Sequence, residues 1–307
     1  MRDGMENLFD PDKPYFEAWV QLHDIDAKHR DDFQNMPDSE PGSRRLYYAA
    51  MCGFYKLVEH LTVKSSQYAS ARGGICGTAL HSASFEGHFQ VVRHLLQHGV
   101  DVNVRNTGND TPLLLASWKG HRDMVECLLE HGAVVDLPDL SQNTPLILAA
   151  THEHVDVVRI LLPHDADVDV RNLDHESSLV RAAEFGIVDI VRVLLEHNAD
   201  PHSQDHRSRT PLHWATLGNE LRGDYPRVVR LLLEHGANAN ARDCNLQTPL
   251  HLASKRPTNL DVLRILLEHG ADIDAEDKDG KTPLQLSTES GHDKVTRLLS
   301  GNYPSKG

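Results

Sequence analysis

The sequence has few cysteines and no long apolar stretch, and both shortages limit what the chain can be. Only four cysteines occur in 307 residues, each in a different part of the chain and without paired spacing. This distribution is typical of reduced thiols and argues against a disulfide framework. No apolar run reaches the roughly 18 residues of a membrane-spanning helix, and the acidic N-terminus lacks the apolar centre of a secretory signal. We therefore expect a soluble, non-secreted protein of the cytoplasm, with the nucleus as an alternative, and no membrane partner.

Basic residues are also scarce relative to acidic ones. The chain has 31 Lys and Arg against 45 Asp and Glu, a formal net charge of −14, and no basic run. Such a chain repels phosphate backbones, which argues against nucleic acid as a partner. The sequence has no Gly-rich phosphate loop, no Cys-x-x-Cys pair and no Gly-x-Ser-x-Gly motif. We expect no enzymatic activity, no catalytic residues, no cofactor and no small-molecule substrate.

What the sequence does contain is a repeat of about 33 residues. Successive units begin 33, 33, 33, 33, 38 and 34 residues apart. A fixed period in this range predicts a stacked array of small units instead of one globular core. The units open with Thr-Pro-Leu or a variant of it, and they begin at Thr78, Thr111, Thr144, Ser177, Thr210, Thr248 and Thr282.

The unit that begins at Thr78 shows the predicted local structure. A Thr hydroxyl can cap free amides at a helix start, and the Pro found next to it in most units is tolerated in a first turn. Leu80 and Ala83 follow at helical spacing, Gly87 interrupts the helix, and a second apolar stripe of helical period ends before Gly99. Each unit therefore reads as helix, tight turn, helix and extended loop, and neighbouring units must supply the burial that such short helices need.

These motifs together resemble the ankyrin repeat. Thr210–His213 (Thr-Pro-Leu-His) and Leu232–Asn238 (Leu-Leu-Glu-His-Gly-Ala-Asn) match its pattern closely. The resemblance implies an all-α repeat fold, an ankyrin solenoid of about eight helix-turn-helix units with β-hairpin fingers. We divide the chain into an acidic N-terminal segment at 1–42, an ankyrin-repeat array at 43–300 and a short tail at 301–307. The first repeat lacks the Thr-Pro opening.

Some units depart from the pattern. The unit that begins at Thr144 has Glu153 where Gly is usual, Pro163 at the end of its second helix and Asp165 at the helix-ending position. The next unit opens with Ser-Ser and has Asn198 in place of the helix-ending Gly. We predict that the array is least stable across residues 144–198. Five extra residues within Gly218–Pro226 lie between two helices.

The first 42 residues differ from the array in charge. They hold eleven acidic and four basic residues, and Phe16, Trp19, Val20 and Leu22 could line one face of a short helix. A capping helix over the first repeat, a separate docking segment and disorder are the three interpretations. Leu8–Asp12, Asp24–Asp26 and Leu46–Ala50 also resemble, with lower specificity, segments that precede the ankyrin region of fungal NACHT-type receptors.

The 21 histidines do not predict a metal site. Thirteen of them occupy positions fixed by the repeat: the fourth position of the Thr-Pro-Leu-His opening or its variant, the position after the mid-unit Gly or its replacement, or the position before the helix-ending residue. Equivalent positions in packed neighbouring repeats lie about 8–10 Å apart, whereas zinc ligands must all lie within about 2 Å of one ion. We expect structural roles for these histidines and no bound metal.

The best candidate functional residues lie on the surface that an ankyrin array makes concave, formed by finger tips and first helices. Exposed Trp and Arg are frequent hot-spot residues, and two large aromatics hold the same position in consecutive repeats. The predicted partner-binding residues are Phe85, Arg105, Trp118, Lys119, Leu140, Arg171, Leu173, Phe185, Arg207, Arg209 and Trp214.

We predict that the chain is a protein-protein interaction scaffold that binds a protein partner through this concave face. An alternative is the ligand-sensing region of a larger NACHT-type signalling ATPase, which would carry a Walker A segment upstream. A third hypothesis is a substrate for modification, because the ankyrin resemblance places Asn103 and Asn240 at positions that asparaginyl hydroxylases modify in other members.

Overall fold

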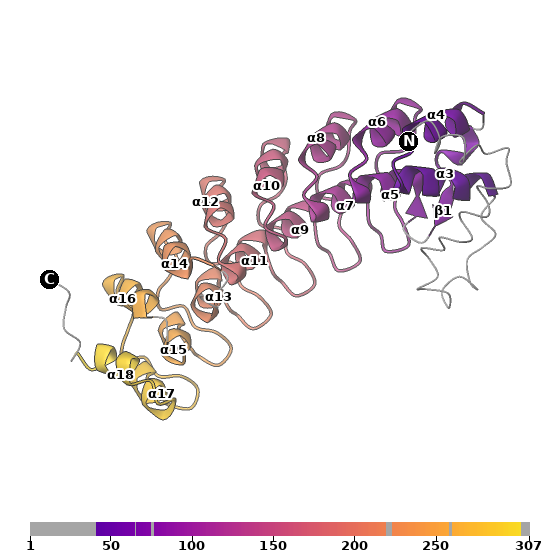
Figure 1. Cartoon of the computed structure of the whole chain (residues 1–307). Coiled ribbons are helices and arrows are strands. Elements are labelled where there is room, and N and C mark those ends of the chain that lie inside the picture. Colours follow the sequence, from indigo (N-terminus) through magenta and orange to yellow (C-terminus); the bar gives the residue numbers. More distant parts are fainter. Residues whose placement is uncertain (1–40, 65, 75–76, 219–222, 258–259, 302–307) are drawn as a thin grey trace, which may run out of the picture. The chain divides into compact units, whose positions relative to one another are not determined.

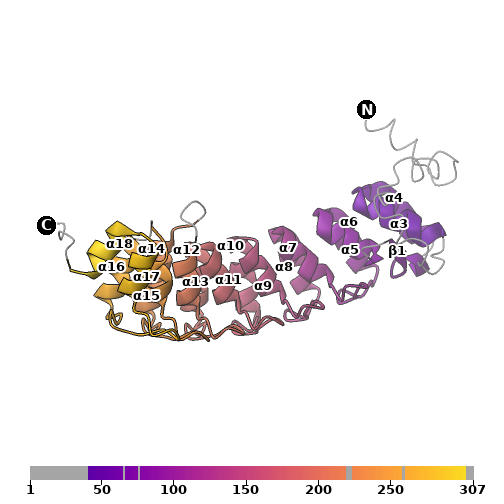
Figure 2. The same cartoon turned by 90° about the horizontal axis from the view of Figure 1, so that it is seen from below.

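The computed structural model describes residues 41–64, 66–74, 77–218, 223–257 and 260–301. The predicted N-terminal cap and the tail beyond residue 301 lie outside the described residues. The chain divides into two compact units, one ending at Leu140 and the other beginning at Ser141. Each unit is an array of helix pairs joined by loops, and the described residues hold eight such pairs (Figures 1 and 2). We call the first helix of a pair inner and the second outer.

Unit 1 contains three helix pairs and one short hairpin. Strands β1 and β2 pair antiparallel between the first two helix pairs, and the 3₁₀ helix η3 precedes them. Inner helix α5 packs against both α3 and α7. The elements are α3 (Pro41–Met51), α4 (Tyr55–Lys64), η3 (Ser66–Tyr68), β1 (Arg72–Gly74), β2 (Gly77–Thr78), α5 (Ala79–Glu86), α6 (Phe89–Gln97), α7 (Pro112–Lys119) and α8 (Arg122–Glu130).

Unit 2 contains five helix pairs. Inner helices pack on their inner neighbours and outer helices on their outer neighbours, as the succession from α9 to α18 in Figure 1 shows. The elements are α9 (Pro145–Thr151), α10 (Val155–Leu161), the 3₁₀ helix η4 (Leu162–His164), α11 (Ser178–Phe185), α12 (Val188–Glu196), α13 (Pro211–Leu217), α14 (Tyr225–Glu234), α15 (Pro249–Ser254), α16 (Leu260–Glu268), α17 (Pro283–Glu289) and α18 (Asp293–Leu299).

The repeat motif determines where each inner helix begins. The Thr111 hydroxyl accepts the N–H of Leu114, and the Thr248 hydroxyl accepts the N–H of His251 in the same way. Each Thr is extended and the following Pro fills the first helical turn, where a missing N–H costs nothing. Ser177 caps α11 without a Pro. The predicted helix starts are therefore confirmed.

The helix-ending and mid-unit positions adopt left-handed backbone conformations. Gly87 and Gly99 have φ of 80° and 76°, and the residues that replace Gly in the weaker units adopt the same conformation. Glu153, Asp165 and Asn198 have φ of 65°, 63° and 62°. A side chain in this region is disfavoured relative to Gly.

One detail near the end of α10 differs from the prediction. Pro163 was expected at the end of the second α-helix of its unit, but α10 ends at Leu161 and Pro163 lies within the 3₁₀ helix η4. A proline has no N–H for an α-helical bond, so the chain tightens into a 3₁₀ turn in its place.

The core runs between the two helix layers of each unit. Leu80 and Ala83 on α5 are fully buried, as are Leu95 on α6 and Leu128 on α8. Helices of six to eleven residues are too short to be stable alone, so stability depends on contact between successive repeats.

Candidate binding surfaces

Phe85 and Trp118 form a partly exposed aromatic pair in unit 1. They lie at the C-terminal ends of α5 and α7, with ring centroids 5.4 Å apart in an edge-to-face arrangement. The Nζ of Lys119 lies 4.1 Å from the Phe85 centroid and 5.4 Å from that of Trp118. Trp118 is 39% exposed and Phe85 is half-buried. Three predicted residues are therefore brought together, and a lysine lies over an aromatic face, where a cation interacts favourably.

In unit 1, a histidine in the turn between the two helices of a repeat bonds to the inner helix of the preceding repeat. His121 Nε2 donates to the carbonyl of Phe85 at 2.9 Å, and His88 Nε2 donates to that of Met51 at 2.8 Å. Both histidines follow a mid-unit Gly, and each reaches the end of the preceding inner helix. The last orphan carbonyls of one helix are thereby satisfied by the following repeat.

In unit 2 the equivalent bond in the repeat with the insertion comes from a tyrosine. Tyr225 is buried, and its hydroxyl donates to the Glu184 carbonyl at 3.0 Å. The sequence places Tyr225 directly after the five-residue insertion, where the repeat pattern no longer aligns. Its role could have been found only by asking which residue replaces the missing histidine.

A second buried set of histidines stabilises the inner-helix starts. The Nδ1 of His81 accepts the Thr78 N–H at 3.2 Å, so Nε2 carries the proton that is donated to the Asp110 carbonyl at 3.0 Å. His213 and His251 make the same pair of bonds to their own Thr and to the next finger. These histidines are neutral and structural in this arrangement.

Burial governs the protonation of these side chains. It lowers the pKa of His81 from 6.5 to about 4, partly offset by hydrogen bonds to backbone carbonyls. Burial also lowers the pKa of His213 and of His251. Protonating Nδ1 would remove its acceptor role at the helix start, so the hydrogen-bonding pattern and the desolvation both favour the neutral form.

Phe185 in unit 2 is covered by a charged cluster. Arg181 lies over its ring at 5.0 Å and pairs with Glu184 at 2.5 Å and with Glu176 at 3.5 Å. Burial raises the pKa of Glu184, and the Arg181 charge opposes this rise. Sequence reasoning missed Arg181, although Glu184 and Phe185 follow it on the same helix. Its third partner, Glu176, lies on the preceding finger and becomes visible only in the fold.

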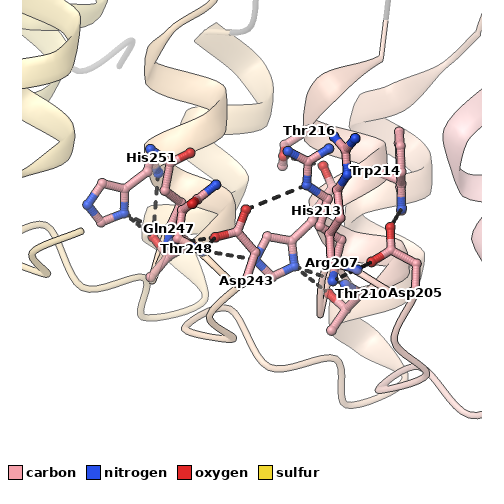
Figure 3. A network of polar contacts seen from close by, with 12 residues as sticks. Asp205, Arg207, Thr210, His213, Trp214, Thr216, Asp243, Gln247, Thr248 and His251 are labelled. Carbon is pink, nitrogen blue, oxygen red and sulfur yellow. Dashed lines mark hydrogen bonds and ion pairs between the residues drawn. The ribbon is translucent and has the colours of Figure 1, made fainter. Parts of the chain in front are cut away.

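Trp214 lies within a second polar network together with Asp205 and Asp243 (Figure 3), and Arg209 contacts both Trp214 and Asp243. The Trp214 indole donates to Asp205 at 3.0 Å, and the Arg209 guanidinium lies 5.3 Å from the Trp214 ring. Arg209 also pairs with Asp243 at 3.5 Å, and the Asp243 side chain is fully buried. The structure brings these two predicted residues together. The indole N–H and the guanidinium both have partners within the protein.

The predicted finger residues fall into two groups. The side chain of Arg105 donates to the carbonyl of Pro138 at 3.4 Å, and that of Arg171 donates to the carbonyl of Gln204 at 3.4 Å. These arginines thus link neighbouring fingers, although Arg171 remains exposed. Apart from Arg209, the other predicted finger residues are exposed at the tips: Leu140 at 66%, Leu173 at 65%, and Arg207.

The polar groups at finger positions serve the loops themselves. Asn103 bridges to the next repeat, donating to the Gly132 carbonyl at 3.2 Å and accepting the Val134 N–H at 2.8 Å. Asn240 makes the equivalent bonds.

Within the described ranges, no group of three or more His, Cys, Asp or Glu residues could hold a metal ion, and no helix is long and apolar enough to cross a membrane.

The comparisons with known proteins identify the family. The family model for ankyrin repeats, built on three copies, matches residues 46–139, 134–205, 179–277 and 222–306. Together these matches cover most of the chain, which therefore belongs to the ankyrin-repeat family.

Two solved ankyrin domains have the same fold. That of human ASB11 is 27% identical with a TM-score of 0.63, covering 74% of this chain and 99% of its own. That of Bcl-3, described as a unique member of the IkappaB family, is 30% identical with a TM-score of 0.64, covering 75% and 100%.

Curated relatives are similar over shorter stretches. A segment is 33% identical over 108 residues to azaphilone pigments biosynthesis cluster protein L of Monascus ruber, covering 32% of this chain and 22% of that protein. Another is 35% identical over 72 residues to alpha-latrocrustotoxin-Lt1a of Latrodectus tredecimguttatus, covering 24% of this chain and 5% of the toxin. The chain thus matches less than a quarter of either relative. The resemblance to NACHT-type receptors stays a prediction.

Proposed function

We propose that this chain is a protein-interaction scaffold that contacts a protein partner through the inner-helix face of unit 1. Ankyrin repeats are a general protein-protein interaction module, and proteins built from them are generally not enzymes. The observation that carries the proposal is the 39% exposure of Trp118, which packs edge-to-face on Phe85 beneath Lys119. A large aromatic at a partly exposed position, beside a cation, is the composition typical of interface hot spots.

The contrast with unit 2 supports this choice of surface. There the aromatics at the inner-helix face are engaged by charged neighbours, Phe185 by Arg181 and Trp214 by Asp205 and Arg209. A partner that bound over these aromatics would also have to remove their charged neighbours from water, which adds a desolvation cost. In unit 1 the cation over the aromatic pair is Lys119, which is exposed.

The test begins with affinity capture from the cells that express the protein, followed by purification of the captured partner. Changing both Phe85 and Trp118 to Ala should weaken the measured affinity at least about 30-fold, or about 2 kcal/mol, with the melting temperature nearly unchanged. Val63→Ala is the control, because Val63 is an apolar residue of unit 1 that is 74% exposed on the outer helix α4. Unchanged affinity of the double variant would refute the anchor.

A further inference from the structure

The tips of two neighbouring fingers in unit 2 form one rigid surface. We call the loops 204–209 and 242–247 fingers A and B. The N–H of Cys244 in finger B donates to the Arg207 carbonyl in finger A at 2.9 Å, and Lys278 of the following finger donates to the Asn245 carbonyl at 2.9 Å. Finger B is thus held by main-chain hydrogen bonds on both sides. Such a surface would lose little conformational freedom when a partner binds.

The carboxylates of these two fingers are buried and already used. Asp205 accepts the N–H groups of Arg207 and Arg209 at 2.7 and 2.9 Å. Asp243 accepts those of Asn245 and Gln247 at 2.8 and 3.0 Å. Both carboxylates are at most 5% exposed. They shape the loops and contribute no exposed negative charge at the tips.

The exposed charges of fingers A and B are positive. Arg207 and Arg242 are both exposed, and Arg242 makes one hydrogen bond, at 3.2 Å, to the Glu276 carbonyl. Residues 141–307 hold 25 acidic and 18 basic residues, so unit 2 as a whole is acidic. Two arginines at tips without exposed carboxylates are a local reversal of that charge, and they complement a negatively charged segment.

Leu246 is the unusual residue of this surface. It has a φ of 56° and is 44% exposed. A left-handed conformation is disfavoured for leucine. Because the side chain is only partly buried, its burial does not fully compensate for this strain. The equivalent positions of five other fingers share the positive φ, and they are occupied by Asn109, Gln142, His175, Ser208 and Gly280. A strained apolar residue where other fingers have Gly or polar residues indicates a role outside the fold.

We propose that fingers A and B bind an acidic segment of a partner protein, with an apolar side chain on Leu246 and carboxylates on Arg207 and Arg242. This inference deepens the proposed scaffold function by naming the partner's chemistry at a second surface. It depends on residues of unit 2 alone. The variants that test it leave Phe85 and Trp118 intact, so either proposal can fail while the other stands.

The test uses the full chain and a phage-displayed library of random 16-residue peptides. Enriched peptides should carry an apolar residue flanked by Asp or Glu, and their affinity should fall as salt rises. Leu246→Asn should weaken binding at least about 10-fold while the melting temperature stays equal or rises, because Asn tolerates the left-handed conformation. Arg207→Gln and Arg242→Gln should each weaken binding and reduce the salt dependence.

Val134→Asn is the control, since Val134 is a 50%-exposed apolar residue in the loop after α8 of unit 1 and belongs to neither proposed surface. It should leave peptide binding unchanged. Enrichment without carboxylates, or full binding by Leu246→Asn, would overturn the proposal. Two other occupants would do so as well. One is a second copy, if the wild type is dimeric by light scattering and Leu246→Asn is monomeric. The other is the chain's own acidic N-terminus, if a synthetic peptide of residues 1–40 competes with the selected peptides.

Discussion

Acidification should destabilise the repeat around His81 by an amount that the structure allows us to calculate. The folded-state pKa is about 4 and the ordinary value is 6.5, so below pH 6.5 the unfolded chain binds a proton that the folded chain excludes. Because the folded pKa is lowered, the contribution is complete above pH 6.5 and is lost as the pH falls toward 4. By linkage the loss is about 2 kcal/mol at pH 5 and about 3 kcal/mol once both states are protonated.

Substitution of His81 should remove this pH dependence. Gln285 holds the equivalent position in the last repeat, where its side-chain carbonyl accepts the Thr282 N–H at 2.8 Å. His81→Gln therefore places at this helix start a cap that the chain already uses and that does not titrate. His81→Leu follows the apolar residue found in the next repeat, Leu114, and loses the cap as well. At pH 7.5 the variant His81→Gln should be more stable than His81→Leu, because it keeps the cap. Neither variant should show the loss of stability on acidification that His81 causes.

The assay is amide hydrogen exchange read by mass spectrometry on peptides covering residues 78–110, corrected for intrinsic rates at pH 7.5 and 5.0. The opening free energy of the wild type should fall by about 2 kcal/mol more than that of either variant. Other titrating groups, such as Asp110, are common to all three proteins, so they cancel in the difference. An equal fall in wild type and variants would show that His81 is protonated without cost, and the assignment of its neutral form would be refuted.

Two further variants test the stability of unit 2. Pro163→Glu combined with Asp165→Gly should restore an α-helical last turn and relieve a left-handed aspartate, raising stability by about 1–2 kcal/mol in urea unfolding. Residues 144–198 should also exchange amides faster than their flanks, and uniform protection with no gain from the double change would contradict this. Tyr225→Phe should cost about 1 kcal/mol and speed exchange in α14, whereas an unaltered exchange rate would show that the bond to the Glu184 carbonyl adds nothing.

The sequence predicts the repeating framework well, because each framework residue satisfies a requirement local to its own unit. Thr111 caps the helix that it precedes, and Gly87 or Glu153 adopts the left-handed conformation that the turn requires. A fixed period multiplies such local signals, so agreement across units makes them reliable. The helix starts and ends could therefore be placed without coordinates, apart from the 3₁₀ turn at Pro163.

The contacts on the candidate binding surfaces could not be predicted in the same way. The pairing of Arg209 with Asp243 joins residues of different repeats, and the sequence gives no period for which charges meet. The same holds for Arg181 beside Phe185, where the covering residue comes from the same helix but its ion-pair partner Glu176 comes from a finger. The strain at Leu246 becomes apparent only with its φ angle.

The arginine links between fingers have a consequence for how this surface can change over evolution. The acceptors of Arg72, Arg105, Arg171 and Arg242 are main-chain carbonyls, which belong to Arg105, Pro138, Gln204 and Glu276. A carbonyl is present whatever side chain stands at the position, so the accepting finger can exchange its residue without breaking the link. Mutations can then change the side-chain chemistry of the tips while the backbone framework that presents them stays intact.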